Sequence, residues 1–216
     1  GDGRCGPGCD RRRAAATEDL RVIDPHRYFT QELDAHQTVL NAVRETLAEP
    51  FVRMLDVWTT AIENGNKIVF FGNGGSAGDA QHLATELTIR YIRDRAPIAA
   101  LALTTDSSAL TAAGNDLGFD QLFARQIAAL GKPGDVAVGI STSGTSPNVI
   151  AGLKEAKRVG MVVTALGGRD GGAMVALADP ILIVPDQASA RIQEMHITLG
   201  QMLCGALELR LGLVSK

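Results

Sequence analysis

The segment Asp135-Val-Ala-Val-Gly-Ile140-Ser-Thr-Ser-Gly-Thr-Ser-Pro147 joins an apolar run to a hydroxyl-rich turn and a proline. The apolar run predicts a buried strand. Pro147 predicts the first turn of a helix, where its missing N–H costs little. A short apolar strand that leads into a helix is typical of a βαβ unit. The segment therefore predicts an α/β fold with a polar turn at a strand end.

The turn itself, residues 141–146 and here named the hydroxyl loop, has the composition of an anion site. Ser141, Thr142, Ser143 and Ser146 supply hydroxyls, and the following helix start supplies free backbone N–H groups and a favourable dipole. The loop lacks the lysine of a triphosphate-binding P-loop. Its simplest guest is one phosphate on a small molecule. The alternative is a plain capping turn, because Ser and Thr are common N-caps.

Short apolar runs alternate with helical patterns along the rest of the chain. Strands are expected at 67–71, 98–103, 136–140, 161–166 and 181–184. Helices are expected at 25–48, 51–63, 76–93, 107–113, 120–130, 147–160, after 172, and at 189–211, with Pro50 breaking the first two apart and a turn at 114–116. This alternation predicts a three-layer α/β sandwich around a five-stranded parallel sheet. Ligands of such sheets bind beyond the carboxyl ends of the strands.

Size and charge restrict the class of protein. The chain has 216 residues, enough for one sizeable domain, and 45% of them are apolar. A net charge of −3 and a pI near 5.8 argue against a general affinity for nucleic acid or anionic membrane. No apolar run approaches the length of a membrane span. We therefore expect neither a nucleic acid nor a membrane as partner.

The first residues differ in composition from the remainder. Residues 1–16 are rich in Gly and Arg and predict a disordered leader, followed by a single domain over 17–216 whose two N-terminal helices cover about 25–64. The odd cysteine count, Cys5, Cys9 and Cys204, fits a reduced cytosolic protein. An alternative makes Cys5 and Cys9 half of a metal site, although no second pair completes it.

A second polar loop, Gly72-Asn73-Gly74-Gly75-Ser76, also follows a predicted strand. Its glycines permit a tight turn and a close approach of backbone to ligand. Because both loops follow parallel strands, we expect them on one rim of the sheet. An alternative is a nicotinamide-binding Gly-x-Gly-x-x-Gly motif that starts at Gly72, but its third glycine, Gly78, comes one position late. The motif also needs an acidic residue at the end of the second strand, and none is obvious there, although Asp106 is near.

Two helices carry candidate catalytic side chains. His82 and Glu86 are four residues apart and share a helix face, as zinc ligands, as an acid/base pair or as a plain surface pair. On the last helix, Gln193 and Gln201 are eight residues apart, about 80° around the axis, and can share a broad face. His196 lies on the other side of Gln193 and predicts a half-buried polar contact.

Five motifs occur together and in order: Gly72-Asn-Gly-Gly-Ser76, His82-x-x-x-Glu86, Gly114-Asn-Asp116, Ser141-Thr-Ser-Gly-x-Ser146 and Arg191-Ile-Gln-Glu194. Over residues 25–212 this set resembles the sugar isomerase (SIS) fold, specifically the phosphoheptose isomerases. The resemblance implies a flavodoxin- or Rossmann-like sheet in a cytoplasmic homotetramer with shared active sites. It implies conversion of sedoheptulose 7-phosphate to D-glycero-D-manno-heptose 7-phosphate, a source of heptose for lipopolysaccharide or other surface glycans, and a bound zinc ion.

The resemblance also implies roles for single residues. Substrate contacts are implied for Asn73, Gly74, Gly75, Ser76, Asn115, Asp116, Ser141, Thr142, Ser143, Ser146 and Gln193, with the hydroxyl loop on the phosphate. Metal ligands are implied at His82, Glu86, Gln193 and Gln201, with Glu86 and position 201 catalytic. The reaction moves a proton between adjacent carbons through an ene-diol or ene-diolate, and zinc or hydrogen-bond donors stabilise the charge on oxygen.

One departure bears on function, because the family pattern has histidine where this chain has Gln201. An amide cannot act as an acid or a base near neutral pH, and it binds metal more weakly than imidazole. Three hypotheses follow: Glu86 or a metal-bound water moves all protons, the substrate is another phosphosugar, or the protein is a non-catalytic SIS adaptor of the bacterial replication initiator protein. A sugar-phosphate-sensing regulatory domain is less favoured, because no DNA-binding segment is attached.

Overall fold

The computed structural model describes residues 23–215. The predicted leader, Cys5 and Cys9 lie outside the described residues. The chain divides between Ala35 and His36 into two compact units. Helix α1 (Pro25–Thr46) begins in the first unit, where Tyr28, Phe29 and Leu33 are exposed. All candidate site residues belong to the second unit.

The second unit contains the predicted parallel sheet. Its strands are β1 (Ile68–Gly72), β2 (Ala100–Ala102), β3 (Val136–Ser141), β4 (Val162–Gly168) and β5 (Ile181–Val184). All four pairings are parallel, and the strand order is β2-β1-β3-β4-β5. This is the flavodoxin-like order, and the prediction of a five-stranded parallel sheet is confirmed.

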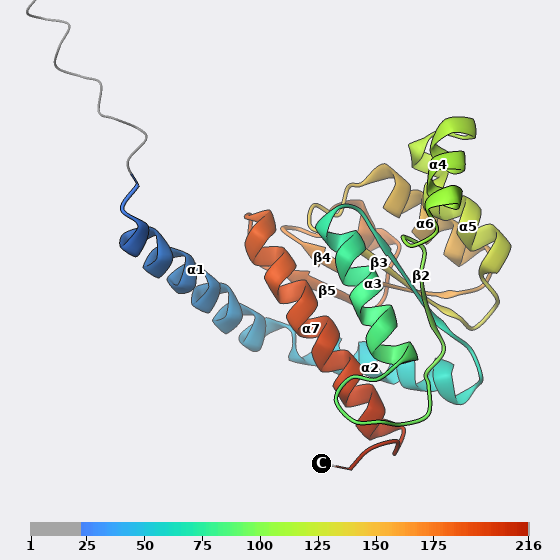
Figure 1. Ribbon diagram of the computed structural model, residues 1–216, viewed down its shortest axis with the longest axis horizontal. Coiled ribbons are helices and arrows are strands. Elements are labelled where there is room, and N and C mark those ends of the chain that lie inside the picture. Colours follow the sequence, from blue (N-terminus) through green and yellow to red (C-terminus); the bar gives the residue numbers. More distant parts are fainter. Residues whose placement is uncertain (1–22, 216) are drawn as a thin grey trace, which may run out of the picture. The chain divides into compact units, whose positions relative to one another are not determined.

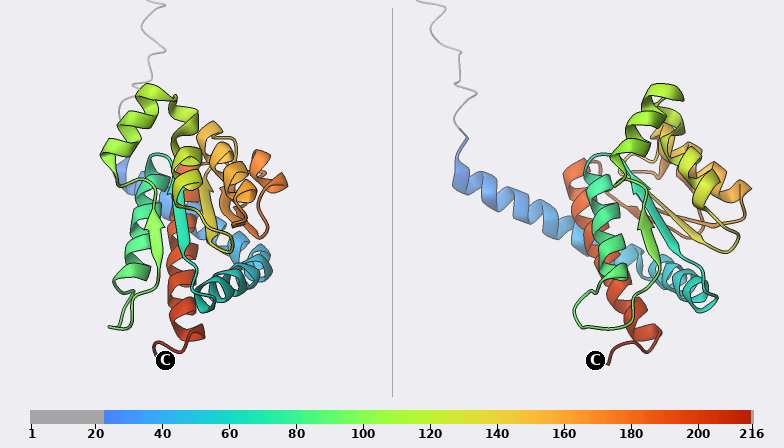
Figure 2. Two further views of the ribbon diagram at one scale, coloured as in Figure 1. Left: turned by 90° about the vertical axis from the view of Figure 1, so that its right-hand side faces the viewer. Right: turned by 45° about the vertical axis from the view of Figure 1, so that its right-hand side comes forward.

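Helices cover both faces of the sheet (Figures 1 and 2). They are α2 (Ala48–Glu63), α3 (Gly75–Thr88), α4 (Ser107–Asp116), α5 (Leu122–Leu130), α6 (Pro147–Arg158) and α7 (Ser189–Arg210), with 3-10 turns η1 (Phe119–Gln121) and η2 (Gly172–Ala176). The core on one face contains residues of α2, α3 and α7, and the core on the other face contains residues of α5 and α6. Among the described residues, no helix is both long and apolar enough to cross a membrane.

Side chains of β1 show how the two cores form. Successive residues of a strand point to opposite faces, so Phe70 enters the core under α2 and Phe71 the core under α5. Phe70 packs edge-on against Trp58 at a centroid distance of 5.5 Å, and Phe71 lies 5.2 Å from Phe123. Because both faces are apolar, polar chemistry is confined to the strand ends.

The prediction that Pro50 breaks the leading helices apart is wrong. Helix α1 ends at Thr46 and α2 begins at Ala48, so Pro50 lies inside the first turn of α2. The first N–H groups of a helix have no intrahelical partner, and a proline there loses no hydrogen bond.

The predicted turn at Gly114-Asn115-Asp116 is also wrong, because α4 continues through Asp116. The reversal of direction comes after it, at Gly118, which has a φ of +86° and precedes η1. Glycine has a low helix propensity, but the hydrogen bonds of α4 outweigh it at Gly114. The last of these bonds runs from the N–H of Leu117 to the carbonyl of Ala113.

We therefore expect Gly114→Ala to raise the free energy of unfolding by up to about 1 kcal/mol, since alanine is the better helix former. A Cβ at Gly114 would meet nothing within 4 Å. Urea denaturation of both proteins measures the difference. Gly118→Ala is the control and should destabilise, because its backbone is left-handed. A Gly114→Ala protein that is less stable than the wild type would contradict the helix at this position and favour the predicted turn.

Candidate active site

The two polar loops lie side by side where β1 and β3 end. Strands β1 and β3 are neighbours in the sheet. The chain goes from β1 to β2 on one side and then crosses to β3 on the other side, so the strand order reverses between β1 and β3. Ligands of such sheets bind at the carboxyl ends of the strands at this switch point. Asn73, directly after β1, and Asn148, in the first turn of α6, exchange two amide hydrogen bonds of 2.8 Å each. The predicted common rim is confirmed, and the Asn73 side chain ties the loops together.

The hydroxyls of the loop after β3 converge on one another. The Oγ of Ser141 lies 3.2 Å from that of Ser146 and 3.4 Å from that of Ser143, and it accepts the N–H of Gly144 at 3.2 Å. Ser146 is the N-cap residue of α6, yet its side chain caps no N–H within the described chain. The Ser146 hydroxyl is therefore not the cap of α6, and the dipole of this helix favours an anion beside it.

Gly144 makes this loop possible. Its φ of +66° is left-handed, and a Cβ would lie 2.1 Å from the carbonyl oxygen of Gly171. The turn after β4 thus packs directly on the hydroxyl loop and fixes its shape.

The loop after β1 prepares the start of α3. Gly74 has a φ of +56° and is the N-cap residue, and the N–H of Ser76 donates to the carbonyl of Asn73 at 3.0 Å. Gly75 leaves room for a side chain of α7, because a Cβ there would lie 2.4 Å from Nε2 of Gln193. The amide of Gln193 is therefore packed against the first turn of α3.

Helix α7 runs from the hydroxyl loop along α3. At its start, the Ser189 hydroxyl lies 3.4 Å from that of Thr142. One turn later Gln193 reaches Gly75, and further along Nε2 of Gln201 lies 3.4 Å from Nε2 of His82. Figure 1 shows the two helices side by side on the same face of the sheet.

His82, Glu86 and Gln201 form a cluster at this helix pair. Nε2 of His82 lies 2.9 Å from Oε1 of Glu86. The His82 side chain is 47% exposed, but that of Glu86 is only 16% exposed. The Glu86 carboxylate is therefore the more enclosed member of the pair. None of the described contacts joins Gln193 to the three clustered side chains.

Asp79 is a titratable group beside this cluster that the sequence analysis missed. Burial raises the pKa of its carboxyl to about 6, and the charge of His82 opposes that rise. Its Oδ2 is buried without a hydrogen-bond partner among the described residues. The signal was available in the sequence, because Asp79, His82 and Glu86 follow one another at three and four residues on one helix face.

His196 is buried completely rather than half-buried as predicted. Its Nε2 donates to the carbonyl of Gly167 at 2.8 Å, and burial lowers its pKa to about 4. A neutral, enclosed imidazole is a structural group. Cys204 is likewise buried, and burial raises the pKa of its thiol, so the thiol is unreactive.

Asn115 and Asp116 lie apart from the other candidates in the described contacts. Both are exposed at the end of α4, and the Asn115 amide donates to the Asp116 carboxylate at 2.7 Å. Asp116 lines a groove between α4 and α5 together with Arg125.

Glu194, in the Arg191-Ile-Gln-Glu194 motif, has one partner inside the motif and one outside it. Its carboxylate accepts from Arg191 at 2.5 Å and lies 2.8 Å from Nδ1 of His36 on α1. Sequence spacing gave no sign of this contact, because His36 and Glu194 are 158 positions apart.

The donor set for a metal ion is small. No group of three His, Cys, Asp or Glu side chains gathers as a metal site in the described part of the chain. An imidazole and a carboxylate are present in His82 and Glu86, and the Gln201 amide, turned over, presents its Oε1 to the same place. These atoms fit a zinc ion, with the amide as the weak ligand.

Comparisons with known proteins agree with one another. Residues 33–168 match the family model of the SIS domain. The phosphoheptose isomerase of Paramagnetospirillum magneticum is 53% identical over 181 residues, which are 84% of this chain and 94% of that protein. The phosphoheptose isomerase structure from Neisseria gonorrhoeae has a TM-score of 0.80 and 44% identity over 85% of this chain and 98% of its own. The structure from Francisella tularensis has a TM-score of 0.83 and 32% identity, and it covers 87% of this chain and 100% of its own.

Asp79→Asn tests the cost of the buried carboxylate. The pKa of Asp79 is higher in the folded protein than its ordinary 3.8, so stability falls as pH rises from about 4 to about 6 and stays reduced above it. With metal-free protein, we expect Asp79→Asn to raise Tm at pH 7.5 by a few degrees (about 2–4 °C) and by less at pH 4.5. Asp120→Asn, at an exposed position, is the control. Equal Tm changes at both pH values would contradict the assignment.

Proposed function

The chain belongs to the SIS domain family and, within it, to the phosphoheptose isomerases, which are aldose–ketose isomerases, and we propose that it converts sedoheptulose 7-phosphate to D-glycero-D-manno-heptose 7-phosphate. The observation that carries this proposal is the cluster of Glu86, His82 and Gln201 on helices that start beside the hydroxyl loop.

The substrate phosphate binds in the hydroxyl loop in this proposal. Ser141, Ser143 and Ser146 present converging hydroxyls, and the dipole of α6, which begins at Pro147, favours an anion at the same place. Thr142 and the backbone of Gly74 and Gly75 complete the rim. The sugar chain then extends from this loop along α3 and α7, with Gln193 beside it.

Glu86 is the base. Its carboxylate takes a proton from C1 of the ketose while the carbonyl oxygen at C2 gains a proton, which gives an ene-diol. The proton held by Glu86 is then returned to C2, and the C1 hydroxyl loses its proton to leave the aldehyde. The hydrogen bond to His82 orients the carboxylate for both transfers.

We assign zinc to His82, Glu86, Gln193 and Gln201. When bound, the ion supplies a Lewis acid for the substrate carbonyl. Gln201 replaces the imidazole of the family pattern, so its amide holds the ion weakly and carries no proton.

The cellular setting follows from the same proposal. The protein acts as a cytoplasmic homotetramer with shared active sites, and its product supplies heptose for lipopolysaccharide or other surface glycans. Gln201 favours one second candidate, a non-catalytic SIS protein that binds a phosphosugar or a replication initiator protein without turnover.

An isomerase assay with sedoheptulose 7-phosphate separates these candidates. We expect metal-stripped protein to gain activity on adding zinc, and Glu86→Gln to lose at least about 100-fold in kcat, because the carbon-bound proton then has no base. Calorimetric binding of the sugar phosphate to Glu86→Gln should persist, since the hydroxyl loop is intact. Glu155→Gln, on α6, is the control. Wild-type protein that binds without turnover would favour the second candidate, and an active Glu86→Gln protein would remove Glu86 from the mechanism.

Gln201→His tests the ligand assignment separately from turnover. An imidazole at position 201 should tighten zinc binding by about tenfold, or about 1.4 kcal/mol, in a competition titration with a chelating dye. Gln121→His, at an exposed position on η1, controls for the addition of a histidine. If the zinc affinity of Gln201→His equals that of the wild type, position 201 does not reach the ion.

A further inference from the structure

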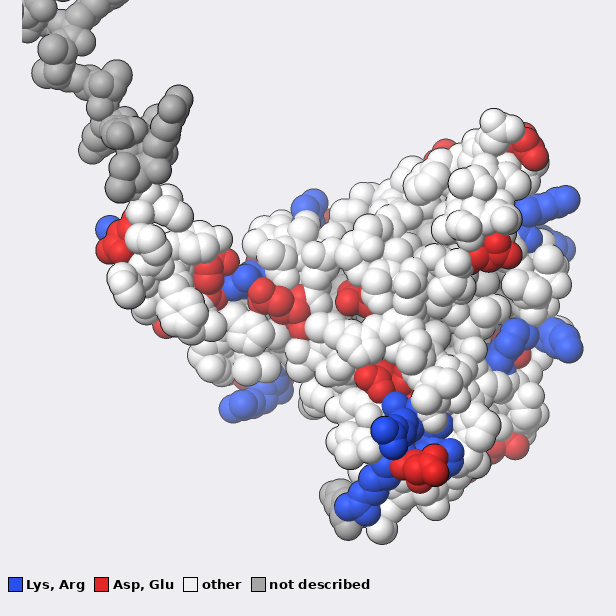
Figure 3. All heavy atoms as spheres, in the orientation of Figure 1, with Lys and Arg blue, Asp and Glu red and all other residues white. Residues whose placement is uncertain are grey.

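The loop between α3 and β2 contains a buried ion pair that the proposed reaction does not use. Nε of Arg95 lies 2.7 Å from Oε1 of Glu208 on α7, and their side chains are 1% and 2% exposed. Figure 3 shows charges of both signs gathered near the C-terminal end of α7, where this loop with its arginines passes. The Arg95–Glu208 pair itself is buried.

Arg95 binds the end of α3 as well as Glu208. Its Nη2 donates to the carbonyl of Glu86 at 2.7 Å, and its Nη1 donates to that of Leu87 at 2.8 Å. Carbonyls in the last turn of a helix have no intrahelical donor, and a cation there is favoured by the helix dipole. One guanidinium thus caps α3 at the residue that carries the proposed base.

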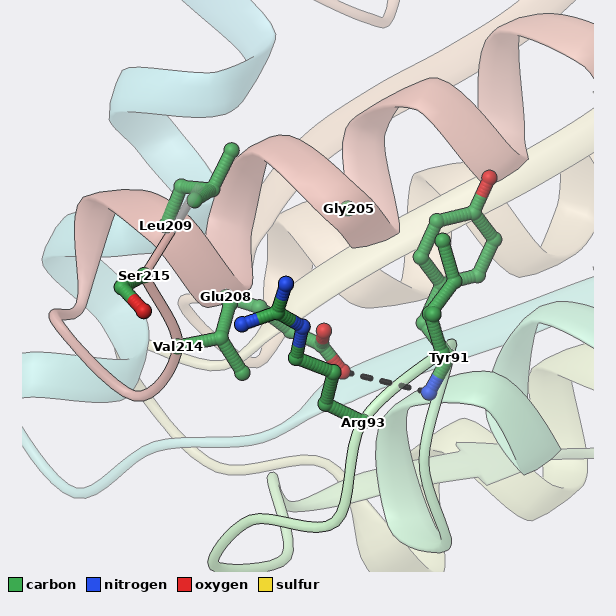
Figure 4. Close-up of a pocket in the computed structure, with 8 residues that line it drawn as sticks. Tyr91, Arg93, Gly205, Glu208, Leu209, Val214 and Ser215 are labelled. Carbon is green, nitrogen blue, oxygen red and sulfur yellow. Dashed lines mark hydrogen bonds between the residues drawn. The ribbon is translucent and has the colours of Figure 1, made fainter.

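Glu208 anchors the same loop to α7. Its Oε1 also accepts the N–H of Tyr91 at 3.2 Å (Figure 4). Gly205, one turn earlier, lets the Tyr91 ring approach, because a Cβ there would lie 2.8 Å from the ring. These residues line a cleft of about 260 Å³ whose floor is α7.

Gln201 and Glu208 belong to one stripe of α7. They are seven residues apart, about two helical turns, and Cys204 is buried between them. Helices α3 and α7 are therefore joined at two levels, by Gln201 to the His82 side chain and by Glu208, through Arg95, to the Glu86 backbone.

Stability alone does not call for an ion pair at this place. Removing two charges from water is costly, and a well-packed apolar pair is often as stable or more so. An apolar pair offers no donors to the carbonyls of Glu86 and Leu87. What the ion pair supplies, and an apolar pair does not, is a fixed position for the end of α3.

We propose that Arg95 and Glu208 are positioning residues, which hold the backbone of Glu86 against α7 and so fix the place of its carboxylate relative to Gln201 and the sugar. The inference rests on the proposed isomerase function. It predicts an effect on kcat, because the base is displaced. It predicts no effect on KM, because the hydroxyl loop belongs to other elements.

The experiment compares the wild type with Arg95→Met/Glu208→Leu and with Arg95→Lys, by thermal unfolding and by steady-state isomerase kinetics. The double variant removes both charges together and leaves no unpaired buried charge, but the carbonyl of Glu86 and the N–H of Tyr91 lose their side-chain partners, so we expect a moderate fall in Tm. The kinetics are therefore measured well below this Tm and expressed per folded protein. We expect its kcat to fall about 10- to 100-fold at unchanged KM, the effect of a displacement near 1 Å. Arg95→Lys keeps the charge opposite Glu208 but loses the planar fork, so it should fold and show a smaller fall in kcat.

Arg158→Met/Glu155→Leu is the matched control, since these residues form an ion pair on α6 in which Arg158 is exposed. It should keep the wild-type kcat and KM. A wild type without turnover overturns the proposed function and the positioning role with it. An active wild type whose Arg95 variants keep full kcat overturns the positioning role alone. A kcat that falls only in proportion to lost folded protein, with a lowered Tm, assigns the pair a purely structural role.

Discussion

The parallel pairing of β1 with β3 is the constraint on which the site depends. Gly72 is paired with Ile140, so the two strands end at the same level and their loops leave the sheet together. Both strands are buried on both faces, which leaves their ends as the place where polar groups can gather. The two hydrogen bonds between the side-chain amides of Asn73 and Asn148 then join the two loops.

The close approach of α7 to α3 is the second constraint. A Cβ at Gly200 would lie 2.6 Å from the side chain of Leu83, so only glycine permits this contact. Gln201 follows Gly200 and His82 precedes Leu83, which places the candidate side chains beside the point of closest packing. The buried contact between Gly200 and Leu83 therefore sets the distance between His82 and Gln201. Arg95 holds the C-terminal end of α3 against α7 in the same way.

Much of this arrangement could be predicted from the sequence, because apolar runs mark strands in a sheet buried on both sides. Pro50 and Gly114 lie inside helices for different reasons. Pro50 is in the first turn of α2, where a proline loses no hydrogen bond, and Gly114 is held by the hydrogen bonds of α4, which outweigh its low helix propensity. The hydroxyl loop could be found because its residues are consecutive. The spacing of Asp79 and His82 is visible in the sequence, but the burial that raises the pKa of Asp79 is not. The burial of Arg95 depends on Glu208, which is far along the chain, and no local pattern contains it.

The amide at position 201 is compatible with the proposed reaction on chemical grounds. The carbon-bound proton moves between adjacent carbons on one face of the ene-diol, so Glu86 alone can take it and return it. What the second group must do is stabilise charge on the substrate oxygens, and an amide N–H donates a hydrogen bond without giving up its proton. Substituting Gln201 for imidazole removes a proton carrier and keeps a donor. The oxygen-bound protons then travel through water, because His82 is assigned to the ion.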